Sequence, residues 1–182
     1  MVGRTFRVEI GLASLTALLV LTACQPAPQS CGDPTTLRTP DGHPDAVGAI
    51  AGPLIFSGFG ATGDATIADW KPGTIQKVLI RHIATSGEVT VSGTRCTDNK
   101  ALRLWYRDSA PFTLRDASST PLPVAVLETT GDERVVFPPT EVGPVILPAH
   151  MGYMFFTTAG KWRIDVASQG TVASIVVRVG AP

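Results

Sequence analysis

Charge is scarce in this sequence and balanced in sign. Among 182 residues there are 15 lysines and arginines and 15 aspartates and glutamates, so the formal net charge is zero. No long run of either sign occurs. Proteins that bind nucleic acid normally carry a basic patch, because they neutralise phosphates. The composition therefore predicts no nucleic-acid partner.

Cysteine is nearly absent as well, with three residues, Cys24, Cys31 and Cys96. Two distant cysteines without an adjacent histidine lack the spacing of metal ligands, so no metal site is predicted around them. A Gly-x-Ser-x-Gly turn, the setting for the nucleophile in many serine hydrolases, is missing too. The sequence predicts no catalytic constellation and no cofactor.

The N-terminus has the layout of a secretory signal peptide. A basic start at Arg4 and Arg7 precedes an uncharged apolar run over residues 10–21. This run is too short for a permanent membrane helix, which needs about 20 residues. The segment LTAC (residues 21–24) resembles the lipobox of bacterial lipoproteins. The resemblance implies that Cys24 becomes the first mature residue and carries acyl chains such as palmitate, which anchor the protein to a membrane.

The resemblance divides the chain into three parts. Residues 1–23 are expected to be the signal peptide, 24–46 a proline-rich tether, and 47–182 the folded domain. Removing the signal leaves 13 basic and 14 acidic residues. The expected location is extracytoplasmic, on the cell membrane or, in a cell with two membranes, on the outer membrane.

The two cysteines left after lipidation of Cys24 form an even pair in an oxidising compartment. We expect Cys31 and Cys96 to form a disulfide, with Cα atoms within about 6 Å of each other. Such a bond fastens the end of the tether to the domain. Two unpaired thiols are the alternative.

Short segments that alternate apolar and polar residues fill the region after the tether. Residues 76–82 place Val78, Ile80 and His82 on one face, and residues 161–168 alternate in the same way. Further strands are expected at 88–93, 101–107, 134–138 and 144–148, at 123–128 (PVAVLE), and at 49–56, the last an edge or bulged strand because Gly52-Pro53 interrupts it. No helical pattern follows the signal helix. The expected fold is an all-β sandwich of seven to nine strands.

The segment TTAGKWRIDVASQGTVASIVVRV resembles the last hairpin of immunoglobulin-like domains in bacterial surface proteins, with Trp162 at a position that is usually tyrosine. Residues 69–95 are similar to a KVLW…GPVLVRG stretch in uncharacterised secreted bacterial proteins with the same ending. The resemblance implies an immunoglobulin-like β-sandwich. It carries no known catalytic residue and therefore implies no activity.

Three sequence features are candidates for binding a nucleotide, a metal ion or a sugar. GFGATG (residues 58–63) fits the dinucleotide fingerprint in letters, but Pro72 and Gly73 close any following helix early, so a glycine loop is expected. His150, Met151 and Met154 offer copper-type ligands, although Met151 and Met154 would point to opposite faces of a strand. Trp105 is expected on the outward face, where an aromatic ring stacks on sugars. His82 is expected to be a half-buried, hydrogen-bonded structural histidine.

These observations predict a non-enzymatic envelope lipoprotein, a binding or interaction module whose partner is an envelope protein or a glycan. Two alternatives stay open at this point. One is a carbohydrate-binding or enzymatic protein with an aromatic site near Trp105. The other is copper handling through His150, Met151 and Met154.

Overall fold

A computed structural model describes residues 31–44, 46–58, 70–84, 87–106, 124–139 and 147–180. Within these ranges there are nine strands and one short helix, α2. Their bounds are β1 Ala49–Ala51, β2 Leu54–Gly58, β3 Ile75–His82, β4 Val89–Arg95, β5 Arg103–Tyr106, α2 Val124–Thr130, β6 Arg134–Phe137, β7 Ala149–Phe155, β8 Gly160–Ser168 and β9 Thr171–Val179.

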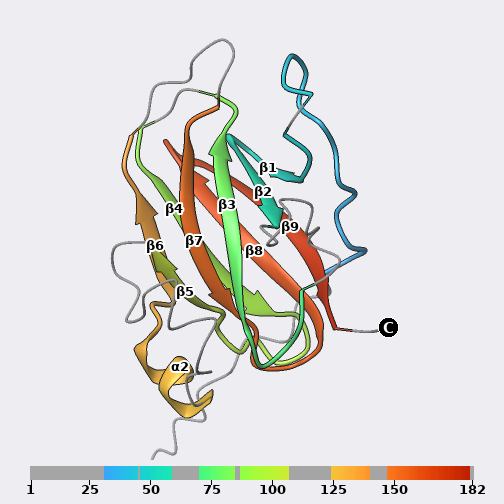
Figure 1. Cartoon of the computed structure of the whole chain (residues 1–182), viewed down its shortest axis with the longest axis vertical. Coiled ribbons are helices and arrows are strands. Elements are labelled where there is room, and N and C mark those ends of the chain that lie inside the picture. Colours follow the sequence, from blue (N-terminus) through green and yellow to red (C-terminus); the bar gives the residue numbers. More distant parts are fainter. Residues whose placement is uncertain are drawn as a thin grey trace, which may run out of the picture.

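The strands form two antiparallel sheets that pack face to face (Figure 1). One sheet has the order β1-β2-β3-β7-β5 and the other β6-β4-β8-β9. In immunoglobulin constant-type domains the orders are A-B-E-D and C-F-G. In this protein the positions of A, B, E and D are occupied by β2, β3, β7 and β5, and those of C, F and G by β4, β8 and β9. The order in which these strands follow one another along the chain is also the same. The domain is an immunoglobulin-like sandwich with β1 and β6 added at two edges, which confirms the predicted fold class.

Period-two alternation fills the core as the sequence predicted. Strand β8 buries Trp162, Ile164 and Val166, and β3 buries Val78 and Ile80. The register pairs Val89 with Ser168 at one end of β4 and Arg95 with Trp162 at the other. Because side chains alternate across each strand, this register places the apolar side chains of β4 and β8 on the same face of their sheet.

The last hairpin closes with a two-residue turn. Ser168 pairs with Thr171, and the residues between them, Gln169 and Gly170, have φ angles of 47° and 80°. Positive φ at both positions is the geometry of a type I′ turn, whose twist matches that of the strands it joins.

The expected single strand over 49–56 is wrong, because it is a hairpin. Strands β1 and β2 pair with each other, and Ala51 lies opposite Leu54. Gly52, at φ 54°, makes the reversal possible. The interruption by Gly52-Pro53 marked a chain reversal instead of a bulge, although β1 does form the sheet edge.

The expected strand at PVAVLE is also wrong, because residues from Val124 onward form helix α2. Leu127 is its buried residue, whereas Val124 and Val126 are exposed. β-branched residues favour a strand only where the strand can pack against neighbouring strands and bury one of its faces. Here Leu127 packs on the outside of a sheet, and one side chain on a short helix achieves that burial. Of the strand expected at 144–148, Leu147 and Pro148 alone are described, and they precede β7.

The segment from Cys31 to Arg38 lies along the edge of β9. The Thr35 N–H donates to the Val176 carbonyl at 2.8 Å, and the Val176 N–H donates to Thr35 Oγ1 at 2.9 Å. Leu37 packs against the main core, and Arg38 forms a β-bridge with Gly48. This part of the expected tether therefore shields an otherwise open strand edge.

Candidate functional site

Cys31 and Cys96 form a disulfide, as the sequence predicted. Their Cα atoms are 5.6 Å apart across a sequence separation of 65 residues. The expected lipidation site, Cys24, lies outside the described residues, as do all of the GFGATG glycines except Gly58, the last residue of β2.

Polar contacts surround the disulfide on both sides. The Cys96 N–H donates to the Lys161 carbonyl at 3.0 Å, and Lys161 Nζ donates to the Gly32 carbonyl at 2.5 Å. Arg95 forms an ion pair with Asp98 in the turn that follows. Cys31 and Gly32 are thus held at the end of β4 and the start of β8 by a covalent bond and by a hydrogen bond.

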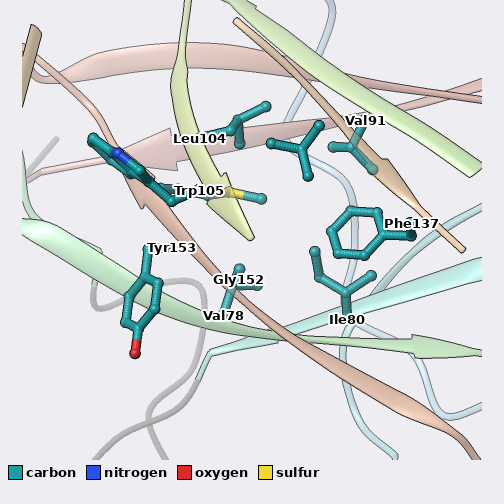
Figure 2. Close-up of a pocket in the computed structure, with 10 residues that line it drawn as sticks. Val78, Ile80, Val91, Leu104, Trp105, Phe137, Gly152 and Tyr153 are labelled. Atoms are coloured by element: carbon teal, nitrogen blue, oxygen red, sulfur yellow. The ribbon is translucent and has the colours of Figure 1, made fainter. Parts of the chain in front are cut away.

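Trp105 does not form an exposed binding platform. It lies on the outward face of its sheet, as predicted, but it is only 2% exposed. Leu127 of α2 covers it, together with Tyr153 and Phe155 of β7. Figure 2 shows Trp105 and Tyr153 on one side of the strands and Phe137, Ile80 and Val91 on the other. The expected aromatic sugar site is therefore replaced by a second, smaller core.

The proposed copper ligands are not brought together. His150 pairs with Ile80 on the inner face, whereas Met151 pairs with Leu79 on the outer face and packs near the Trp105 cluster. Met154 faces inward and is fully buried, but it lies four residues along the strand from His150. At about 3.3 Å per residue, their backbones are about 13 Å apart. In the described part of the chain, no group of three or more His, Cys, Asp or Glu side chains is arranged to hold a metal ion.

His82 meets a second histidine, His150, inside the sandwich, which the sequence pattern did not predict. The rings of His82 and His150 lie with centroids 5.1 Å apart and planes at 70°. Tyr106 Oη is 3.3 Å from His150 Nδ1, and the Phe137 ring centroid is 5.2 Å from that of His150. His82 has no exposed surface, so it is fully buried instead of half-buried. Both histidines occupy inward positions of their strands, but only the β3–β7 register makes them neighbours.

Burial lowers the pKa of both imidazoles and so favours their neutral forms. Desolvation, and secondarily the charge of His150, lower the pKa of His82 from 6.5 to about 4. Desolvation also lowers the pKa of His150. The Nε2 atom of His150 is buried and has no hydrogen-bond partner among the described residues. The partner of His150 at Nδ1 is the phenol of Tyr106, whereas the histidine of a catalytic triad is oriented by a carboxylate.

A small apolar cavity lies beside β3 and β7, the strands that carry the two histidines. Gly152, Met154, Val78 and Ile80 line it with residues of the facing sheet, and its volume is about 10 Å³. That is at the lower limit for one water molecule, and an apolar cavity of this size stays dry. The cavity is a packing defect beside Gly152 and has no room for a ligand.

No protein-family model and no curated protein sequence matches the chain. Within the described residues, no helix has the length and apolar character needed to cross a bilayer. Among the described residues, the disulfide that joins the N-terminal segment to the sandwich is a feature that bears on function.

Proposed function

We propose that this protein is an extracytoplasmic lipoprotein, anchored to a membrane through Cys24, whose immunoglobulin-like domain binds an envelope protein or a glycan and performs no catalysis. The observation that carries the proposal is the disulfide between Cys31 and Cys96. Disulfides of this kind form and persist outside the reducing cytoplasm. The third cysteine stands directly after an apolar run, in LTAC, seven residues before Cys31.

The burial of the chemically reactive side chains supports a binding role over catalysis. Trp105 is packed under α2, and the rings of His82 and His150 contact each other between the sheets. These groups stabilise the fold where they lie. Recognition by a sandwich of this type uses its surface, and function resides in sites carried by the fold.

Lipidation is tested with two matched cysteine variants expressed from the native signal sequence. Cys24→Ala is expected to move the protein from the membrane fraction to the soluble fraction, and the diacylglyceryl mass is expected to disappear from the N-terminal peptide. The Cys31→Ser, Cys96→Ser protein is the control, because it removes the disulfide and leaves Cys24 and its lipid in place. Equal fractionation of the two variants, with no acyl mass on the wild-type peptide, contradicts the proposal.

The binding role is tested in cells that produce the wild-type protein. A cell-surface crosslinker is expected to capture a discrete envelope partner, and a glycan array with the purified domain tests sugars directly. Capture that is lost in the unanchored Cys24→Ala variant supports a partner at the same membrane. Turnover of an envelope polymer by the purified protein would argue for an enzyme instead.

A further inference from the structure

The two ends of the sandwich differ in their connection to the N-terminus. At the end that we call the disulfide end, Arg95 pairs with Trp162 and Gly160 with Val179, and Cys96 follows directly. At the opposite end, the turn end, Val89 pairs with Ser168 and the hairpin turns at Gln169-Gly170. In Figure 1, β3 points toward the turn end, and β7 points toward the disulfide end, where α2 also lies.

The covalent path from the anchor to the disulfide end is short. Seven residue steps lead from Cys24 to Cys31. Whatever their conformation, they span at most about 25 Å, because each residue adds no more than about 3.6 Å. Strand β8 alone, Gly160–Ser168, covers nine residues, or about 26 Å from one end of the sandwich to the other.

We infer that the disulfide orients the domain on the membrane, with the disulfide end facing the lipid surface and the turn end presented outward. This inference rests on the proposed lipidation of Cys24. The disulfide fixes Cys31 to the sandwich, and Lys161 holds the next residue, Gly32, through its carbonyl. The chain therefore leaves the domain toward the membrane at the disulfide end.

The partner of the disulfide end is accordingly a phospholipid bilayer surface, and the surface free for an envelope partner is the turn end. The described loops there include the Gly52-Pro53 turn, the Gln169-Gly170 turn and the parts of the β3–β4 connection at residues 83–84 and 87–88. Gly52 lies close to Ala173, so the two turns are neighbours from different sheets.

Two exposed positions report on this orientation. Lys71 belongs to the disulfide end, because the Gly73 N–H donates to the Phe156 carbonyl and the Gly180 N–H donates to the Trp70 carbonyl. Thr171 is exposed at the turn end. Lys71→Cys and Thr171→Cys each add one free thiol for a donor dye, since the native disulfide does not react.

The full lipidated protein carrying either dye is reconstituted into vesicles of phosphatidylethanolamine and phosphatidylglycerol that contain a small fraction of acceptor-labelled lipid. Energy transfer is expected to be clearly higher from position 71 than from position 171. Equal transfer, or higher transfer from position 171, on protein whose acyl mass is confirmed overturns the orientation alone. Absence of the acyl mass, with no transfer from either position, overturns the proposed lipidation and the orientation with it.

Removing the disulfide separates its role from that of the anchor. When the disulfide and the neighbouring hydrogen bonds of Lys161 to the N-terminal segment are lost, the next residue that holds this segment on the sandwich is Thr35. Its backbone is hydrogen-bonded to Val176 of β9. Four further residues add up to about 14 Å of reach. In the Cys31→Ser, Cys96→Ser protein, transfer from position 71 is expected to fall while the acyl mass stays. Unchanged transfer would show that the disulfide does not set the orientation.

Discussion

The imidazoles of His82 and His150 meet edge to face between the two sheets, with ring centroids 5.1 Å apart. They come from neighbouring strands of one sheet, and Tyr106 and Phe137 from two other strands pack against His150. Two titratable rings in mutual contact inside a core make the stability of the fold dependent on pH.

Acid is expected to destabilise the domain. Folding favours neutral His82, whose pKa is about 4 in the native state against 6.5 ordinarily. As pH falls below 6.5, the unfolded chain takes up a proton first, so the stabilising contribution is complete above pH 6.5 and is lost as pH falls toward 4. The loss amounts to up to about 3 kcal/mol for His82. His150 adds to it in the same direction, because its pKa is also lowered.

Urea unfolding at about pH 7.5 and about pH 4.5 measures this loss. The His82→Leu protein is expected to lose less stability between the two pH values than the wild type. His43→Leu, which changes a histidine in the N-terminal segment outside the core, is the matched control and should behave as the wild type. An identical pH dependence in all three proteins would show that His82 does not cause the loss of stability in acid.

Reduction of the disulfide is expected to lower the melting temperature. A bond that closes a loop of 65 residues restricts the unfolded chain by about 4 kcal/mol on the chain-entropy model. For a domain of this size the midpoint should fall by about 10 °C. Calorimetry with and without dithiothreitol measures the shift, and titration of the native oxidised chain should find no reactive thiol at Cys31 or Cys96. Two reactive thiols there would show that the bond is not formed.

Gly152→Ala is expected to stabilise the protein by up to about 1 kcal/mol, because alanine restricts the unfolded chain and fills the adjoining cavity. A Cβ atom at this position meets Val78 at 3.4 Å and Ile80 at 3.5 Å, which are ordinary contacts. Gly131→Ala provides the contrast. Its Cβ would lie 2.7 Å from the Cβ of Arg103, so overpacking should destabilise the fold by about 1–3 kcal/mol. Chemical unfolding of both variants checks the opposite signs.

Leu127→Ala is expected to destabilise the domain by about 2 kcal/mol or more, because it removes the side chain of α2 that covers Trp105. Val126→Ala on the same helix is the control. Val126 is 38% exposed, and its truncation should change the free energy of unfolding by no more than about 0.5 kcal/mol. Equal losses in the two variants would mean that α2 does not cover a second core.

The alternation around Trp105 predicted the direction of its side chain but not its burial. Alternation along residues 101–107 correctly placed Leu104 inward and Trp105 outward. Exposure of the outward face depends on what else packs there, and α2 comes from a segment about 20 residues later in the chain. The same holds for His82, whose inward position was readable from β3, whereas its contact with His150 required the pairing of β3 with β7.

The sequence by itself determined the period-two strands, the closing hairpin around Gln169-Gly170 and the pairing of the two cysteines, because each depends on local alternation, turn chemistry or a simple count. Only the tertiary structure decided that Gly52-Pro53 reverses the chain, that Val124–Thr130 is a helix, and that His82 meets His150. Those outcomes depend on which surfaces remain to be buried once the sheets have formed. Burial is a property of the whole molecule, and no window of neighbouring residues contains it.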